Sequence, residues 1–305
     1  MLSLDHFEKY GFTKLESCVD ESLCDQIKKK VLESRDFDNK IFLDKLIFEQ
    51  KNPNAFNKNP RPGFNYADKL NDLLIIIQKN TKITEFLNKL LDSNYDIFRR
   101  KFVCGVSSKW LPVWIKNIIK NDPAANLAHF VKKKHTDITW FHGIDFHQDL
   151  VDWQNYQPNF ITLYVYLEDV KIDMAPIFLL PKSHNLGPAI FPHNCKLVDK
   201  KKGIWLYENP ISKKVLRAKH SIQLAKKGTV FIWHALTLHG TQAAKSIIPR
   251  VSLRYLIRTN SRNSFLNKMN KMIGEDLSLS SLRMDLDKKG IAKSKDNKIN
   301  FYELY

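Results

Sequence analysis

Residues 139–149 read Thr-Trp-Phe-His-Gly-Ile-Asp-Phe-His-Gln-Asp, and this stretch decides the fold and the chemistry expected of the chain. Its first nine residues are rich in aromatic and β-branched side chains, which favours a β-strand. His147 and Asp149 are two residues apart, so on an extended chain their side chains point to the same side. The stretch therefore predicts a strand that presents one imidazole and one carboxylate together.

Short segments of the same character follow along the second half of the chain, and several alternate apolar with polar residues. The Lys-Gly pair at 227–228 predicts a turn between two of these strands. Several short strands at close spacing are typical of an antiparallel barrel or a double-sheet jelly roll. The predicted strands are 139–147, 160–168, 176–180, 219–225, 229–234 and 250–258.

The first hundred residues have helical periodicity instead. Asp20 can cap a helix that runs to about Ser34, and two later segments have similar apolar spacing. The predicted fold class is therefore mainly β with α. We expect a single domain over 1–305, with a mainly helical cover over 1–100, a jelly-roll core over 101–258, and a helical and polar C-terminal extension over 259–305.

Length and composition exclude several classes of protein. The chain has 305 residues, of which 43% are hydrophobic and 27% charged, so it can bury a sizeable core and is not a low-complexity protein. No run approaches the roughly 18 apolar residues that a membrane span needs, and the first residues lack the pattern of a secretory signal. Four scattered cysteines fit a reducing compartment, so we expect a cytoplasmic protein.

The formal net charge is +17, and its lysines are spread along the whole chain. This spread favours a solvated, lysine-rich surface. A basic substrate funnel is the alternative, and it favours an anionic partner, for example a small molecule linked to CoA or to a carrier protein. Nucleic acid is a disfavoured partner, because no nucleic-acid motif accompanies the charge.

A metal site built on His147 and Asp149 needs a third ligand, and His239 is the best candidate. Two histidines and one carboxylate form the facial triad of non-haem Fe(II) oxygenases, which leaves the other face of the metal open for a co-substrate and O2. The internal alternative to the first pair is His135 and Asp137, which have the same spacing. They lie beside three lysines, where the strand pattern is weaker.

Arg250 opens the last predicted strand, eleven residues after His239. A guanidinium there can hold a carboxylate in a two-pronged contact, and Thr241 can add a hydroxyl to it. A metal with a carboxylate clamp predicts a keto acid that chelates iron at one end, which describes 2-oxoglutarate. Arg254 and Arg258 share the strand face of Arg250 and are its rivals for this role.

Other combinations of side chains predict less. His142 and Asp145 do not share a strand face, and His184 is expected to be a structural turn residue. His193 and Cys195 could suggest a nucleophile and its base, but no orienting third group accompanies them.

Taken together, these segments resemble the phytanoyl-CoA dioxygenase family of Fe(II)/2-oxoglutarate-dependent oxygenases. The resemblance covers about residues 5–258 and is dense from 140 to 258. Three departures are Asp173-Met-Ala-Pro176 in place of the family's Asn-Gly-Ala/Cys, Lys182 in place of the glycine of its Pro-Gly-Ser-His segment, and no asparagine soon after Thr241. The matching segments are 7–12, 146–149, Trp153, 161–169, 177–184, 228–233, 238–241 and Arg250.

The resemblance implies a double-stranded β-helix, or jelly-roll, core with helices packed outside it. It also implies that His147, Asp149 and His239 hold Fe(II), with 2-oxoglutarate and O2 as co-substrates. The distal carboxylate of 2-oxoglutarate would be bound by Arg250 and Thr241. By the same resemblance, Gln148 and Trp153 line the site near the cofactor or the substrate.

The implied activity is hydroxylation of a small, anionic or carrier- or CoA-linked metabolite, with release of succinate and CO2. The presence of Asp149 favours this reaction over halogenation, since halogenating members replace that carboxylate with a small residue. The alternatives are a non-catalytic jelly-roll protein that binds a metal or ligand, and a related oxygenase that desaturates, cyclises or epimerises its substrate. Candidates for substrate contacts lie in the turn-rich loop 50–66: Phe56, Arg61, Phe64 and Tyr66.

Overall fold

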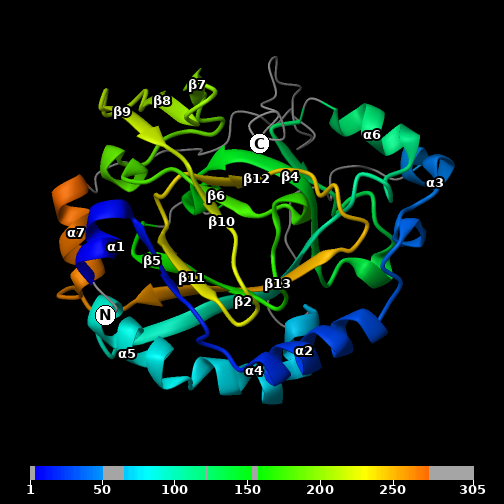
Figure 1. Cartoon of the computed structure of the whole chain (residues 1–305), viewed down its shortest axis with the longest axis horizontal. Coiled ribbons are helices and arrows are strands. Elements are labelled where there is room, and N and C mark those ends of the chain that lie inside the picture. Colours follow the sequence, from blue (N-terminus) through cyan, green and yellow to red (C-terminus); the bar gives the residue numbers. More distant parts are fainter. Residues whose placement is uncertain (1–3, 51–64, 121, 153–156, 275–305) are drawn as a thin grey trace.

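The computed structural model describes residues 4–50, 65–120, 122–152 and 157–274, and one curled β-sheet forms its centre (Figure 1). The strands of this sheet are β1 (Phe12–Leu15), β2 (Tyr95–Gly105), β3 (Ala124–Asn126), β4 (Thr139–His147), β5 (Phe160–Tyr166), β6 (Ile177–Leu179), β10 (Ser221–Gln223), β11 (Val230–His234), β12 (His239–Thr241) and β13 (Arg250–Thr259). They pair in the order β1-β11-β5-β13-β2-β4-β12-β6-β10, with β3 on β4. The predicted jelly-roll core and the mainly β class are confirmed.

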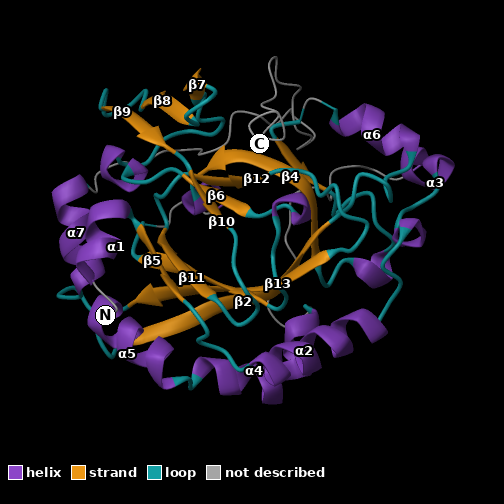
Figure 2. Cartoon of the chain, viewed as in Figure 1, coloured by secondary structure: helices purple, strands orange, loops and turns teal. Residues whose placement is uncertain are grey.

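Helices cover the outer face of the strands β11, β5, β13 and β2 (Figure 2). The alternation along β5 explains why: Leu163 and Val165 pack outward against the helices, whereas Tyr164 and Tyr166 point into the interior of the curled sheet. Asp20 accepts hydrogen bonds from the amides of Ser22 and Leu23, as the sequence predicts for a helix cap. The helices are α1 (Leu4–Tyr10), α2 (Glu21–Glu33), α3 (Lys45–Gln50), α4 (Asn71–Gln78), α5 (Thr81–Leu91), α6 (Val113–Ile119) and α7 (Phe265–Ile273).

A second, three-stranded sheet lies beside the core and was not predicted from the sequence (Figure 1). It consists of β7 (Lys196–Asp199), β8 (Ile204–Glu208) and β9 (Val215–Lys219), in that order. Trp205 and Tyr207 on its inner face pack with Phe146 and Phe178 of the core sheet. This packing supports the end of β4, where the predicted ligand His147 lies.

The predicted turn between two strands at Lys227 and Gly228 is confirmed, and the two strands that it joins pair with different neighbours. The preceding strand, β10, pairs with β6, whereas β11 pairs with β5 and β1. Gly228 places this turn against the segment before α2. The carbonyl oxygen of Gly228 accepts hydrogen bonds from the amides of Cys18 and Val19. Its φ is +78°, and a Cβ there would lie 2.1 Å from the carbonyl oxygen of Val19, so glycine is required.

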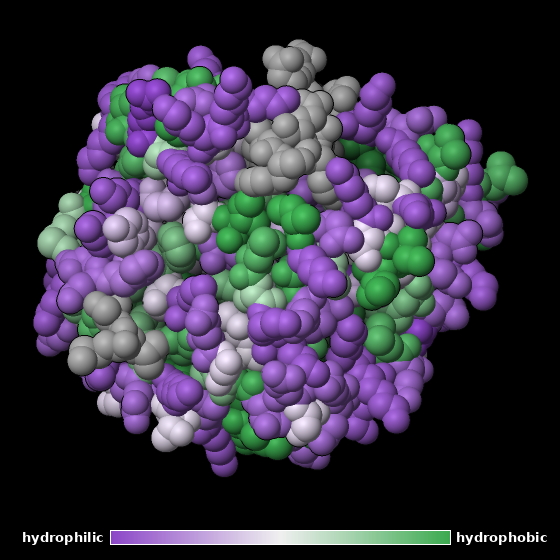
Figure 3. Space-filling view, viewed as in Figure 1, coloured by the Kyte–Doolittle hydropathy of each residue, from purple (hydrophilic) through white to green (hydrophobic). Residues whose placement is uncertain are grey.

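The first hundred residues contribute β1 to the sheet in addition to the helices, and β2 begins at Tyr95. The three-part division of the chain stays a prediction. All four cysteines are buried, and none of them forms a disulfide. Hydrophilic side chains surround a central hydrophobic area on the face seen in Figure 3. Within the described ranges, no helix is both long enough and apolar enough to cross a membrane.

Candidate metal centre

Three predicted ligands meet where β4 and β12 pair. His147 ends β4 and His239 begins β12, and the two are direct partners across the antiparallel pair. Asp149 follows in the short 3-10 turn Asp149–Asp152, with its Oδ1 3.5 Å from Nε2 of His239. One potential ligand atom from each residue lies within 4.8 Å of the other two, a grouping that can hold one metal ion.

The two imidazoles are oriented by backbone carbonyls. Nδ1 of His147 donates to the carbonyl of Asp145 at 3.0 Å, and Nδ1 of His239 donates to that of Thr237 at 3.0 Å. Each Nε2 is therefore left with its lone pair for a metal. Burial, reinforced by the neighbouring His239, holds the pKa of His147 well below its usual range, so this ring is in the neutral form that binds metals.

The Asp149 carboxylate is held by side chains from three neighbouring strands. Its Oδ2 accepts hydrogen bonds from the hydroxyl of Thr162 on β5 and from Nε1 of Trp233 on β11, the latter at 2.8 Å. Its Oδ1 contacts the guanidinium of Arg254 on β13. Burial alone would raise the pKa of Asp149, but Arg254 and His239 outweigh it, so the pKa lies well below its usual range and the group is ionised.

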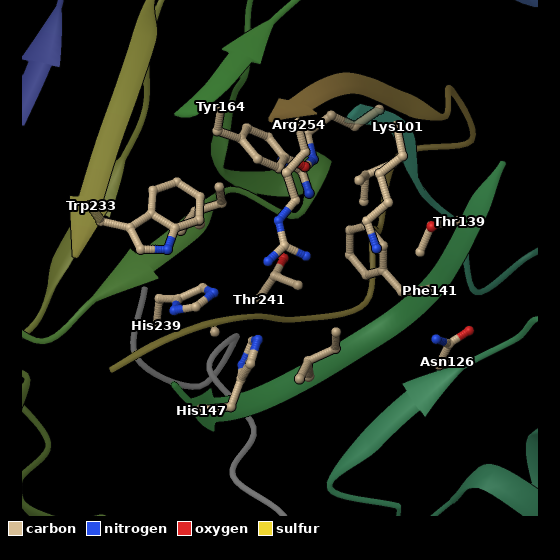
Figure 4. Close-up of a pocket in the computed structure, with 15 residues that line it drawn as sticks. Lys101, Asn126, Thr139, Phe141, His147, Tyr164, Trp233, His239, Thr241 and Arg254 are labelled. Carbon is tan, nitrogen blue, oxygen red and sulfur yellow. The ribbon is translucent and has the colours of Figure 1, made fainter. Parts of the chain in front are cut away.

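A cavity opens beside the three ligands, inside the curled sheet (Figure 4). Its lining combines cations with aromatic rings, and the labelled side chains of β4, β5, β11, β12 and β13 point toward one another around it. The cationic residues are Lys101, Arg250 and Arg254, and the aromatic residues are Phe141, Tyr164 and Trp233. Thr241 and both histidines also line the cavity, so it joins the ligands to the predicted carboxylate clamp.

Arg250 is the most deeply buried of these cations, with 1% of its surface exposed. Its guanidinium carbon lies 5.4 to 5.7 Å from the ring centres of Phe141, Tyr164 and Tyr166. Its Nε and Nη1 have no hydrogen-bond partner in the described part of the chain. Burying an unsatisfied charged donor is costly, so this geometry fits a site that receives an anion.

The hydroxyl of Thr241 donates to the carbonyl of Ala175 at 2.9 Å. The hydroxyl must rotate its hydrogen away from Ala175 before it can donate to a carboxylate in the cavity. Of the two rivals of Arg250, Arg254 lines the same cavity but contacts Asp149, whereas Arg258 pairs with Asp96 at 2.9 Å.

The structure gives no support to a cofactor contact by Gln148, and we do not propose one. Its amide nitrogen donates to the carbonyls of Gly187 and Leu236, and its oxygen accepts the amide of Ala189. Because successive residues of an extended chain point to opposite sides, the middle residue of His-Gln-Asp turns away from the ligands. Gln148 fixes the surrounding loops instead.

The predicted substrate contacts, and Trp153, which is predicted to line the site near the cofactor or the substrate, are mostly not placed. Trp153, Phe56, Arg61 and Phe64 lie outside the described residues. Tyr66 lies in the helical layer, where it packs in the core and its hydroxyl donates to the carbonyl of Lys30. This position is on the other side of the sheet from the cavity, so Tyr66 does not line the cavity.

The rival ligand pair does not assemble a site. The carboxylate of Asp137 is engaged by both terminal nitrogens of Arg35. His135 is buried, and the single potential metal-ligand group within the described ranges is the one that contains His147. His193 accepts the amide of Gln148 and contacts the hydroxyl of Tyr207, which is a structural arrangement.

The jelly roll and the two-histidine, one-carboxylate ligand set together define the class of non-haem Fe(II) oxygenases. The sequence model of the phytanoyl-CoA dioxygenase (PhyH) family matches residues 7–252. The chain belongs to the phytanoyl-CoA dioxygenase family. It is thereby an Fe(II)- and 2-oxoglutarate-dependent enzyme of the oxygenase superfamily, and the predicted cofactors are confirmed.

Solved structures with a similar fold share little sequence with this chain. The α-ketoglutarate-dependent epimerase SnoN from nogalamycin biosynthesis is 14% identical, with a TM-score of 0.48 over 84% of this chain and 80% of SnoN. The carbocyclase SnoK from the same biosynthesis is 11% identical, with a TM-score of 0.46 over 84% and 82%. HygX from Streptomyces hygroscopicus, with iron bound, is 10% identical, with a TM-score of 0.42 over 85% and 87%. No curated protein matches the sequence.

Proposed function

We propose that this chain hydroxylates a small anionic metabolite with 2-oxoglutarate and O2, and that succinate and CO2 are released. The observation that supports this most is the grouping of His147, Asp149 and His239 beside the buried guanidinium of Arg250. The three ligands would hold Fe(II), and Arg250 would hold the distal carboxylate of 2-oxoglutarate. When bound, iron and the keto acid supply the oxidation, in which O2 delivers one atom to succinate and one to the substrate.

The residues of the chain contribute orientation. The carbonyls of Asp145 and Thr237 orient the imidazoles of His147 and His239. Thr162 and Trp233 hold the carboxylate of Asp149 in place by hydrogen bonds. Arg250 donates to an anion from a position walled by aromatic rings, which keep water away from that contact. No acid or base side chain has to move a proton, which agrees with a cavity lined by cations, aromatic rings and neutral polar groups.

The decisive experiment is reconstitution with Fe(II) and 2-oxoglutarate, followed by exposure to O2. We expect Fe(II)-dependent formation of succinate, even without substrate at a low rate, and its loss in Asp149→Ala. A protein that binds iron and 2-oxoglutarate yet forms no succinate would contradict the proposal and favour the non-catalytic alternative. Product analysis with a substrate panel then separates hydroxylation from desaturation, cyclisation and epimerisation, and tests CoA- or carrier-linked substrates.

A further inference from the structure

Arg254 is the cation of the cavity that lies against the metal ligands. It faces Lys101 on β2 and Tyr164 on β5 in the strand register, so all three side chains share the inner face of the sheet. Its side chain is 14% exposed, and one terminal nitrogen contacts Oδ1 of Asp149. Its Nε has no hydrogen-bond partner in the described part of the chain. A guanidinium has five N–H donors, so this one has donors left for a further acceptor.

The charge inside the cavity is unbalanced. Two arginines, Arg250 and Arg254, line it, and no carboxylate is among the described lining residues. Asp149 at its edge offsets one positive charge. Glu168, the acid behind Arg250, is engaged by the amide of Val251 and by Lys28.

The cofactors do not remove this excess. Iron adds two positive charges, and 2-oxoglutarate brings two carboxylates, one for the metal and one for Arg250. A net positive charge remains in a largely buried space, which is costly unless another anion enters.

From this geometry we infer that Arg254 binds an oxyanion of the substrate, a carboxylate or a phosphate, directly beside the metal site. This inference rests on the proposed function and narrows its substrate class. Because Arg254 touches a metal ligand, the acidic group it holds lies close to the carbon that is oxidised. The substrate is then a small acid that reacts near its own anionic group. A CoA thioester, whose phosphates lie far from the acyl carbon, does not satisfy this contact.

The test compares acids with neutral molecules of the same shape. Protein loaded with Fe(II) and 2-oxoglutarate is titrated anaerobically with butyrate, hexanoate, octanoate and butyl phosphate, and with the primary amides of the three carboxylates. Calorimetry gives the affinity of each probe. The variants are Arg254→Gln, Arg254→Lys and, as the matched control on the same strand, Arg258→Gln, whose side chain pairs with Asp96 instead.

We expect at least one oxyanion to bind wild type about 10- to 100-fold more tightly than its neutral counterpart, the range expected for a charge-assisted hydrogen-bonded contact. Arg254→Gln should abolish this preference, Arg254→Lys should keep part of it, and Arg258→Gln should leave it unchanged. If Arg254 only positions Asp149, Arg254→Gln will lower iron affinity and weaken acids and amides equally. That result, or no preference for any oxyanion in wild type, overturns the inference.

The outcome is separable from that of the proposed function. Fe(II)-dependent succinate formation by wild type without any probe tests the oxygenase activity alone. Anaerobic binding of acids against amides tests Arg254 alone, because it requires no turnover.

Discussion

His147 and His239 lie opposite each other in the antiparallel pair of β4 and β12, with their ring centres 4.1 Å apart. Each ring donates Nδ1–H to a carbonyl two residues before it, at Asp145 and Thr237. The same local arrangement is therefore used twice, once on each strand. In each case the hydrogen bond from Nδ1 to a backbone carbonyl turns the Nε2 atom toward Asp149. The backbone of the sheet therefore sets the orientation of both imidazoles.

Replacing either histidine should remove iron and activity but not the fold. We expect His147→Ala and His239→Ala each to lower iron-dependent succinate formation at least about 100-fold, because two ligands hold the metal too weakly. Bound iron per chain and the melting temperature are measured together. His142→Ala is the control, since His142 lies on the same strand and contacts the carbonyl of Val106. Wild-type iron content in either ligand variant would refute the assignment.

Replacing Arg250 should raise the concentration of 2-oxoglutarate that the enzyme needs. Its buried guanidinium is expected to make charge-assisted bonds worth about 1.5–3 kcal/mol each, so Arg250→Lys should raise the KM for 2-oxoglutarate roughly 10- to 100-fold. Lysine keeps the charge, which limits unfolding. Arg258→Lys on the same strand is the control. An unchanged KM in Arg250→Lys would shift the role to Arg254.

Removing one hydrogen bond to Asp149 should weaken iron binding without removing a ligand. Thr162→Val keeps the shape of the side chain but loses the hydroxyl that donates to Oδ2. Partners of this kind typically change metal affinity about 10- to 100-fold. A competition titration of Fe(II) measures the change, and Thr162→Ser, which restores the donor, should recover most of the affinity. Equal affinity in wild type and Thr162→Val would show that the hydroxyl is dispensable.

The sequence could predict which residues come together because strand alternation is a local property. It placed His147 and Asp149 on one face and supplied His239 and Arg250, all of which the structure brings to one place. The same alternation placed Arg254 on the strand face of Arg250, but the sequence offered Arg254 only as a rival to Arg250. Alternation along one strand could not predict that Arg254 contacts Asp149, because that contact depends on how β13 lies relative to the turn after β4.

Strand pairing was the part that the sequence could not supply. The segments around Gly228 are strands as predicted, but β10 and β11 join different partners, because pairing depends on contacts far along the chain. For the same reason, the sequence did not predict the residues that donate hydrogen bonds to Asp149. Thr162 lies on β5 and Trp233 on β11, and the two residues are opposite each other where these strands pair. Neither belongs to a recognisable motif.

Stability should fall in mild acid because of buried neutral histidines. His234 accepts the amide of Leu236 at Nδ1 and donates to Asn270 from Nε2, so its ring is held neutral. Burial, with a contribution from His184, lowers the pKa of His234 to about 3, whereas an unfolded histidine titrates near 6.5. Below about pH 6.5 the unfolded chain therefore binds a proton that the folded chain does not bind. The free energy of unfolding falls as the pH is lowered toward the pKa of the folded state.

Denaturant unfolding at several pH values checks this contribution. His234 should account for a loss of about 1.4 kcal/mol per pH unit in the free energy of unfolding between about pH 6 and about pH 4. His234→Gln, which cannot titrate, should show a slope shallower by that amount whatever its stability at neutral pH. Parallel slopes for wild type and His234→Gln would contradict the prediction.

A crystal grown without oxygen in the presence of Fe(II) and 2-oxoglutarate tests the central assignment most directly. Anomalous diffraction at the iron absorption edge locates the metal independently of any assumed ligand set. We predict one iron peak bonded to Nε2 of His147, Nε2 of His239 and the carboxylate of Asp149, with the far carboxylate of 2-oxoglutarate on Arg250. Iron bound elsewhere, or no iron between these three side chains, would contradict the account.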